Sequence, residues 1–372
     1  MRVDQGMCRK LRSAVLFTVV LSIGGAVAHS QAQAGGSGSG PSFQQIAALG
    51  TAKLQSWLDA RTGLYDTTGW WNSANAVTAL ADYTRVTNDG QYLGVFPKVL
   101  AQAQRTSPGF LNNYYDDEGW WALAWIDAYD ITHEERYLEM SASIVADMAK
   151  GWDDTCSGGI WWSKDRKYKN AIANELFLSV AAHMVARSRS EKEKAQYLSW
   201  AEREWKWFAS TGMINADHQV NDGLDAHCAN NHKTTWTYNQ GVVIGGLAEL
   251  YGQTHDQKLL EEANAIAAAT LVNPALIDKE GILHEPCEPN CGADGTQFKG
   301  IFVRNLARLY AASPAETYKR FVNANAESIW KGMQPPEYGI GLMWSSPYGD
   351  VNASTQSSGV DALVAAAALE AR

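Results

Sequence analysis

The chain carries little positive charge for its length. Its 372 residues include 31 lysines and arginines against 40 aspartates and glutamates, which gives a formal net charge of −9. Nucleic acids and anionic membranes are bound through basic surfaces. The shortage of basic residues therefore argues against both as partners, whereas a neutral sugar is compatible with it.

Motifs for cofactors and metals are missing as well. The sequence contains no phosphate-binding loop, dinucleotide-binding fingerprint or cluster of metal-ligating residues. His232 and His284 show no ligand pattern, so the residues around the cysteines do not have the spacing of a zinc site. We therefore expect neither a cofactor nor a bound metal.

Cysteine is scarce, with five in the whole chain. Cys8 falls in an N-terminal segment that we expect to be removed, which leaves Cys156, Cys228, Cys287 and Cys291. An even number of cysteines in an exported protein predicts disulfides, and four cysteines allow three pairings. We favour Cys287–Cys291 as a short loop clip and Cys156–Cys228 as a link between two longer loops. A zinc site is the alternative.

The first residues have the pattern of a secretory signal. A basic cluster precedes an apolar run at residues 14–27, which is too short to cross a bilayer comfortably, and small-residue cleavage sites follow. We expect a signal peptide over residues 1–28, with an uncleaved anchor as the alternative, and a flexible Gly/Ser-rich tail over residues 29–41. No apolar stretch ends the chain. We therefore expect a secreted, extracellular protein without membrane contact after signal removal.

Helical patterns dominate from residue 42 onward. One group of segments is amphipathic with a 3.6-residue period, which is typical of helices with one side toward solvent. These segments are residues 43–58, 91–104, 134–150, 195–208, 257–271 and 315–330. Thr132 and Glu135 have the spacing of a capping box at the start of the third. A second group is apolar nearly all round, which indicates helices with protein on every side. These are residues 72–86, 117–131, 170–187, 238–252, 297–311 and 356–369.

The two groups alternate strictly, with a loose period of roughly 50–60 residues and two helices in each unit. An open array of such repeats would need polar end repeats. The last segment, residues 356–369, instead has the composition of a buried helix. The sequence therefore predicts an all-α fold, an (α/α)6 barrel of six inner and six outer helices. We expect it to form one domain over residues 42–372 and to be a monomer.

Polar and aromatic residues gather at the N-terminus of each segment of the second group. In a closed barrel these six ends lie at one rim. Such a rim suits a carbohydrate, because polar groups bind hydroxyls and flat rings pack on the apolar faces of sugars. Helix capping alone would explain the polar residues but not the tryptophan pairs at 70–71 and 161–162.

Asp116 and Asp117 stand side by side at the start of one buried segment. Adjacent carboxylates repel, so folding gains little from placing them beside apolar surface. A glycosidase uses such a pair because one carboxylate stays ionised while its neighbour holds a proton. An ordinary helix N-terminus is the alternative, since acidic side chains favour its free N–H groups.

Residues 114–121 (YYDDEGWW) resemble the hallmark of glycoside hydrolase family 76, the endo-α-1,6-mannanases. The likeness covers about residues 42–371 and continues at residues 156–162, 169–177, 237–241, 298–300 and 356–358. The resemblance implies an (α/α)6 barrel and a retaining mechanism that cleaves internal bonds of α-1,6-linked mannan or manno-oligosaccharides.

The resemblance also implies roles for the pair, with Asp116 as the nucleophile and Asp117 as the acid/base. Cα atoms of neighbouring residues lie about 3.8 Å apart. Their side chains can therefore reach the carboxyl separation of retaining enzymes, roughly 5–5.5 Å. An ionised Asp116 would raise the pKa of Asp117, as an acid catalyst requires. A second pair, Asp153–Asp154, lacks the Asn/Tyr flank, and we assign it to a loop or to the wall of a subsite.

Further residues of the rim are candidates for substrate binding. They are Asn113, Tyr115, Trp120, Trp161, Trp162, Asn170, Asp222, Tyr238, Asn239, Gln240, Asp294, Lys299 and Trp344. For the tryptophans, packing in the core is the alternative to stacking on sugars.

Three other functions stay open at this point. A transglycosylase that moves mannan-bearing chains onto cell-wall glucan would use the same two aspartates. A non-catalytic mannan-binding protein has no use for two crowded carboxylates. A lyase or inverting hydrolase of the same fold usually places its carboxylates on separate helices, unlike the adjacent pair in this chain.

Overall fold

The computed structural model describes residues 40–371. The expected signal peptide and nearly all of the expected tail lie outside the described residues. Twelve α-helices make up most of the unit that begins at Pro41. They are α1 (Phe43–Gln55), α2 (Trp70–Thr87), α3 (Val95–Ala103), α4 (Tyr115–Thr132), α5 (Glu135–Met148), α6 (Ala171–Ala186), α7 (Glu191–Ser210), α8 (Thr237–Thr254), α9 (Gln257–Thr270), α10 (Phe298–Ala312), α11 (Glu316–Gly332) and α12 (Ala353–Glu370).

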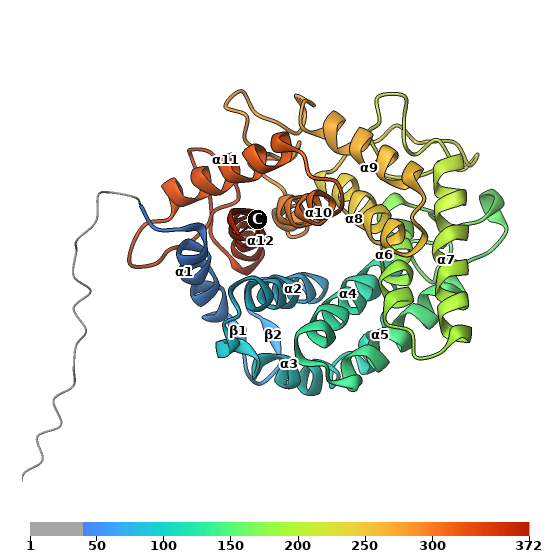
Figure 1. The fold of residues 1–372 in the computed structure, drawn as a ribbon, viewed down its shortest axis with the longest axis horizontal. Coiled ribbons are helices and arrows are strands. Elements are labelled where there is room, and N and C mark those ends of the chain that lie inside the picture. Colours follow the sequence, from blue (N-terminus) through green and yellow to red (C-terminus); the bar gives the residue numbers. More distant parts are fainter. Residues whose placement is uncertain (1–39, 372) are drawn as a thin grey trace, which may run out of the picture. The chain divides into compact units, whose positions relative to one another are not determined.

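The even-numbered helices form a closed inner ring (Figure 1). Each packs on the next, from α2 through α4, α6, α8 and α10 to α12, and α12 packs on α2 again. The odd-numbered helices lie outside this ring: α5 packs on α4, α7 on α6, α9 on α8, and both α1 and α11 on α12. The predicted (α/α)6 barrel is therefore confirmed.

Burial follows the two sequence patterns. In α6 every residue from Ala171 to Val185 is buried. In α5 the buried residues recur at helical spacing, and they are Tyr137, Leu138, Ser141, Ile144, Val145 and Met148. An inner helix thus has protein on all sides, whereas an outer helix buries one face.

Several helix ends differ from the sequence-based expectation. The expected capping box at Thr132 is wrong, because α4 extends to Thr132 and His133 takes a left-handed conformation as its C-cap. Glu134 then precedes α5 without a side-chain cap. Between α1 and α2 the chain forms a small antiparallel pair, β1 (Leu58–Asp59) with β2 (Leu64–Tyr65).

The loops between helices are tied by disulfides. Cys156 is bonded to Cys228, and Cys287 to Cys291. Both expected pairings are therefore confirmed. Within residues 40–371, no helix combines the length and the apolar character needed to cross a membrane.

Candidate active site

A cavity of ≈ 500 Å³ lies at the end of the barrel where the inner helices begin. Its size falls in the range of ligand pockets, roughly 300–1,000 Å³. The lining combines carboxylates, aromatic rings and one amide. It consists of Trp71, Tyr114, Asp116, Asp117, Trp120, Trp162, Tyr168, Asn170, Asp222, Tyr238, Asp294 and Phe298. Both predicted catalytic aspartates and six of the predicted substrate-binding residues are thus brought together.

Asp116 and Asp117 occupy the first turn of α4. Trp162 donates its indole N–H to Asp116 Oδ2 at 3.0 Å, and Asn112 donates its amide to Asp117 Oδ2 at 2.6 Å. Asp116 Oδ1 is buried and has no hydrogen-bond partner among the described residues. Each carboxylate is therefore held by one neutral side-chain donor, and one oxygen of Asp116 has no hydrogen-bond partner among the described residues.

Burial dominates the protonation of this pair. It raises the pKa of Asp116 well above its usual range, and the charge of Asp117 adds to the rise, against the hydrogen bond from Trp162. Burial also raises the pKa of Asp117 to about 6, against the hydrogen bond from Asn112. Since both shifts are upward, the pair holds a shared proton more readily than two separate carboxylates would. The raised pKa of Asp117 agrees with the sequence-based expectation for an acid catalyst, although burial rather than the charge of Asp116 is its main cause.

Local hydrogen bonds fix the segment that carries the pair. The side-chain oxygen of Asn112 accepts from the Tyr114 backbone N–H at 2.7 Å, which turns the chain into α4. The backbone N–H of Asn112 donates to Glu118 Oε1 at 3.0 Å. Lys164 also donates to Glu118 Oε1, at 2.7 Å. Burial nevertheless raises the pKa of Glu118 to about 7, against the lowering effect of Lys164.

Two more carboxylates complete an acidic lining. Tyr168 donates its hydroxyl to Asp222 Oδ2 at 2.5 Å, and Trp71 donates its indole N–H to Asp294 Oδ1 at 2.9 Å. Among the described residues that line the cavity, none is basic. The charge of Asp294 contributes to the raised pKa of Asp117, after burial.

Buried amides hold the loops that form the cavity wall. Gln240 on α8 accepts from the Val220 N–H at 2.8 Å and donates to the Val220 carbonyl at 2.9 Å. Asn174 on α6 binds Ile160 in the same two ways, at 2.7 and 3.0 Å. These pairs fix the loops that lead to Asp222 and Trp162. Gln240, expected to bind substrate, therefore binds backbone instead.

The structure places further predicted residues outside the cavity. Lys299 and Trp344 are both buried. Lys299 is paired with Glu288 and donates to the Leu342 carbonyl at 2.7 Å, and its Nζ lies 4.9 Å from the centre of the Trp344 ring. The neighbouring residue Phe298 lines the cavity instead. One step along a helix turns the side chain by roughly 100°, which explains why only one of the two faces the cavity.

Trp161 also lies beside the cavity rather than in its lining. Its indole N–H donates to Asp153 Oδ2 at 2.7 Å, and Lys169 Nζ lies 4.9 Å from its ring centre. Burial acts to raise the pKa of Asp153, but the hydrogen bonds from Trp161 and Lys169 lower it to about 2. Asp153 is thus an ordinary ionised partner of Trp161 and Lys169, and it lies in the loop between α5 and α6, outside the cavity lining.

Three other predicted residues do not line the cavity either. Asn239 is fully buried. Asn113 is exposed and its carbonyl accepts from the Lys164 N–H at 2.9 Å. Tyr115 is buried with its ring against Gly151.

Some lining residues were not among the sequence-based candidates. They are Trp71, Tyr114, Tyr168 and Phe298. Trp71 and Tyr114 belong to rim clusters that the sequence does show, so their doublets with Trp70 and Tyr115 are the signal that could have identified them. Phe298 belongs to the segment 298–300 that carries the family resemblance, whereas no comparable signal marks Tyr168.

Comparison with known protein families shows to which family this chain belongs. The family model described as Glycosyl hydrolase family 76 matches residues 52–372. The chain belongs to glycosyl hydrolase family 76. The match covers the helices from which the cavity is built.

Relatives of this family 76 protein include fungal and bacterial proteins. A mannan endo-1,6-α-mannosidase of Candida albicans is 28% identical over 73% of this chain and 65% of its own length. One of Saccharomyces cerevisiae is 26% identical over 76% of this chain and 66% of its own length. The chain thus spans slightly less than two thirds of these relatives.

A solved structure is similar over nearly the whole barrel. It is an α-1,6-mannanase of Salegentibacter sp. HEL1_6, as an inactive variant with two consecutive aspartates replaced by alanine, in complex with an α-1,6-linked mannose tetrasaccharide. The TM-score is 0.80 at 25% identity, and the alignment covers 88% of this chain and 100% of that chain.

Metal chemistry has no ready-made site in the described part of the chain. Within residues 40–371, no three His, Cys, Asp or Glu side chains are grouped so that they could hold a metal ion.

Proposed function

We propose that this family 76 protein is a secreted, retaining glycoside hydrolase that cleaves internal α-1,6-mannosidic bonds of mannan. The observation that carries the proposal is the placement of Asp116 and Asp117 together in a cavity lined by aromatic rings. The two family relatives named mannan endo-1,6-α-mannosidases, and the mannanase inactivated at two consecutive aspartates, support the substrate and the pair. The chain's other pair, Asp153–Asp154, is not part of the cavity lining.

In the first step, Asp117 gives its proton to the glycosidic oxygen while Asp116 attacks the anomeric carbon. The bond to the leaving sugar breaks, and an ester forms between mannose and Asp116. The raised pKa of Asp117, about 6, suits it to hold a proton at mildly acidic pH. Asp116 must be ionised for this step, and the indole N–H of Trp162 stabilises its anion.

In the second step, Asp117 takes a proton from water, and the water oxygen attacks the anomeric carbon. Asp116 leaves as a carboxylate, so the α-configuration is restored after two inversions. The amide of Asn112 stabilises the ionised form of Asp117 that this step needs. The two neutral donors thus favour the anion of each residue at the step where it acts.

Substrate would be held by the remaining lining. Trp71 and Tyr238, which are partly exposed, offer ring surface for the apolar sides of mannose, and Asn170, Asp222 and Asp294 offer groups for its hydroxyls. The acidic lining favours neutral glycans and repels polyanionic ones.

The test is incubation of the purified protein with linear α-1,6-mannan, with products followed by mass spectrometry and proton NMR. Short oligosaccharides that first appear as the α-anomer support the proposal. Products that first appear as the β-anomer would overturn retention. Longer, transferred chains would assign transglycosylation, and binding without turnover would assign a non-catalytic role.

The roles within the pair are tested by azide rescue on an aryl α-1,6-mannobioside. Asp116→Ala with azide is expected to give a β-mannosyl azide, because azide replaces the nucleophile with one inversion. Asp117→Ala is expected to give the α-azide, since azide then attacks the ester formed on Asp116. The opposite stereochemistry in the two variants would exchange the roles.

Secretion is tested on the full chain expressed in a secreting host. We expect the N-terminus of the protein recovered from the medium to lie near residue 29. A chain that keeps its first residues and stays with the membrane would contradict the signal-peptide assignment.

A further inference from the structure

Four aromatic rings from four inner helices form a cluster in the cavity lining. Trp71 stacks on Trp120 with ring centres 5.7 Å apart, and Trp120 stacks on Tyr238 at 6.4 Å. Tyr238 in turn stacks on Phe298 at 3.7 Å. A displacement of any one ring in this aromatic cluster would therefore displace the rings that pack on it.

Trp120 links this cluster to the two aspartates. It follows Asp117 by three positions and Asp116 by four on α4, so the three side chains share one face of the helix. Its ring is buried and lines the same cavity as both carboxylates. A shift of the Trp120 ring would change both the apolar surface beside the aspartates and the surface available to a sugar.

Arg304 contacts Trp120 from another direction. It lies on α10, and its guanidinium carbon is 5.9 Å from the centre of the Trp120 ring. Arg304 also lines a second cavity of ≈ 90 Å³, which it shares with Arg85, Arg308 and other residues of α2, α10 and α12. Trp120 and Arg304 therefore stand between the two cavities, with Trp120 toward the aspartates.

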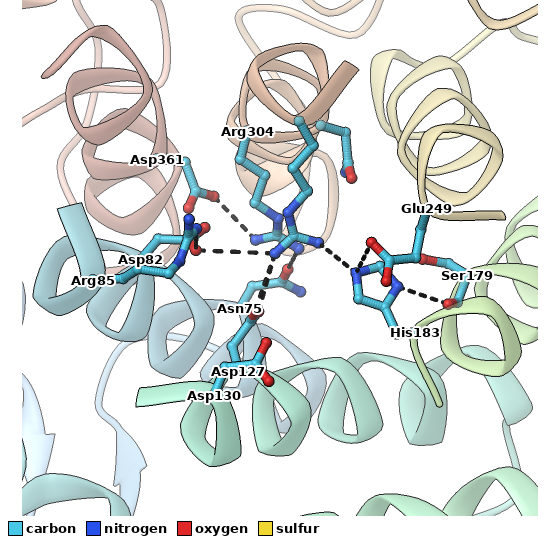
Figure 2. A network of polar contacts seen from close by, with 12 residues as sticks. Asn75, Asp82, Arg85, Asp127, Asp130, Ser179, His183, Glu249, Arg304 and Asp361 are labelled. Atoms are coloured by element: carbon cyan, nitrogen blue, oxygen red, sulfur yellow. Dashed lines mark hydrogen bonds and ion pairs between the residues drawn. The ribbon is translucent and has the colours of Figure 1, made fainter. Parts of the chain in front are cut away.

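Two buried partners hold the guanidinium in place. Arg304 donates to Asp361 Oδ2 at 3.1 Å and to Asn75 Oδ1 at 2.5 Å. Figure 2 shows Arg304 between these two side chains, which come from α12 and α2. Arg304, Asp361 and Asn75 are at most 4% exposed. Water therefore competes little with the contact between the guanidinium and the ring.

The surroundings of Arg304 also have a structural role. Each inner helix contributes a polar or charged residue to the polar network of Figure 2. The ion pairs that join helices are Arg304–Asp361, Arg308–Asp127, Arg308–Asp82, Arg187–Asp130 and Arg187–Glu249. Arg304 differs from the other arginines of this network because it also touches an aromatic ring of the candidate active site.

We propose that Arg304 is a positioning residue of the candidate active site. Its guanidinium, held by Asp361 and Asn75, fixes the Trp120 ring and through it the aromatic cluster beside Asp116 and Asp117. The inference rests on the proposed function of that site. The alternative is that Arg304 only neutralises the buried charge of Asp361.

Two variants distinguish positioning of Trp120 from simple neutralisation of Asp361. Arg304→Met leaves Asp361 buried without its cation, so a loss of stability is expected under either role. The double variant Arg304→Met/Asp361→Asn removes the stranded charge and should recover much of the thermal stability. If Arg304 positions Trp120, the double variant still has kcat/KM on α-1,6-mannan lowered by about 10- to 100-fold, as small misplacements in active sites do.

Arg308→Met is the matched control. Arg308 lies one turn further along α10 in the same network and pairs with Asp127. It has no cation–ring contact with the aromatic cluster among the described residues. Its loss is expected to lower the melting temperature while kcat, KM and the pH profile stay as in the wild type, measured well below that temperature.

A second measurement does not require turnover. The carboxyl carbons of Asp116 and Asp117, labelled with carbon-13, are titrated by NMR in the wild type and both variants. The double variant should shift the titration of the pair, and Arg308→Met should not. If the wild type does not cleave mannan but the double variant shows this titration shift, the proposed function is overturned and the positioning role is kept. Wild-type activity and titration in the double variant would overturn the positioning role.

Discussion

Replacing Trp162 by phenylalanine tests the electrostatics of the candidate site most directly. The change removes the indole N–H that donates to Asp116 Oδ2 at 3.0 Å. It keeps an aromatic ring beside Tyr114, whose ring centre lies 4.9 Å from that of Trp162. Because the other oxygen of Asp116 has no partner among the described residues, this bond is the main side-chain support of the anion.

The magnitude follows from the kind of bond that is lost. A hydrogen bond to a charged group contributes about 1.5–3 kcal/mol. Trp162 is 37% exposed, so water replaces part of the loss and the lower end applies. About 1.4 kcal/mol corresponds to a tenfold loss of kcat/KM and to one unit of pKa. Since the bond favours the anion, its removal raises the pKa of Asp116. The acidic limb of the pH profile should therefore move up by about one unit.

The assay is kcat/KM on linear α-1,6-mannan from pH 3 to 8. Trp161→Phe is the matched control, because the neighbouring indole also donates to a carboxylate, Asp153, at 2.7 Å but lies outside the cavity lining. We expect about wild-type activity in that variant. An unshifted acidic limb in Trp162→Phe, or an equal loss in both variants, would refute the reasoning.

Two further predictions concern other carboxyl groups. Asn112→Ala removes the donor that stabilises the Asp117 anion at 2.6 Å. The pKa of Asp117 should then rise above about 6, and the basic limb of kcat/KM should move to higher pH; an unmoved limb would contradict this. Burial raises the pKa of Glu285 from 4.5 to about 8. Between pH 4.5 and about 8 the folded state holds the Glu285 proton and the unfolded state does not. The free energy of unfolding should therefore fall as the pH rises through this range, by about 1.4 kcal/mol per pH unit for this group. When the free energy of unfolding is measured in urea at several pH values, Glu285→Gln should depend less steeply on pH than the wild type. Equal slopes for the two proteins would contradict the prediction.

The helices and the ring could be predicted because their signals are local. A helix surrounded by protein is apolar all round, and one on the outside is amphipathic, so α6 and α5 differ visibly in sequence. Ring closure followed from the buried character of the last helix, α12. The candidate pair that lines the cavity could be singled out because two adjacent carboxylates at a helix start are conspicuous in any sequence.

The roles of the surrounding polar residues could not be predicted, because they depend on contacts distant in the chain. Gln240 looks like a sugar-binding residue at a helix start, but it satisfies the backbone of Val220, 20 positions away. Buried loops need such partners for their N–H and carbonyl groups. Lys299 likewise forms its pair with Glu288, a residue of the preceding loop. The upward pKa shifts of Asp116 and Asp117 could not be derived from the sequence either, because burial is their main cause.

The arrangement of charge along the barrel has a physical origin in the helices themselves. The inner helices place their N-termini at one end, where Asp116 and Asp117 occupy the first turn of α4. Arg85 lies in the last turn of α2, and Arg187 is the C-cap of α6. A helix favours anions at its N-terminus and cations at its C-terminus. The same dipoles thus assist the ionised carboxylates of the proposed reaction at one end and the arginines at the other. Arg304 and Trp120 stand where these two regions meet.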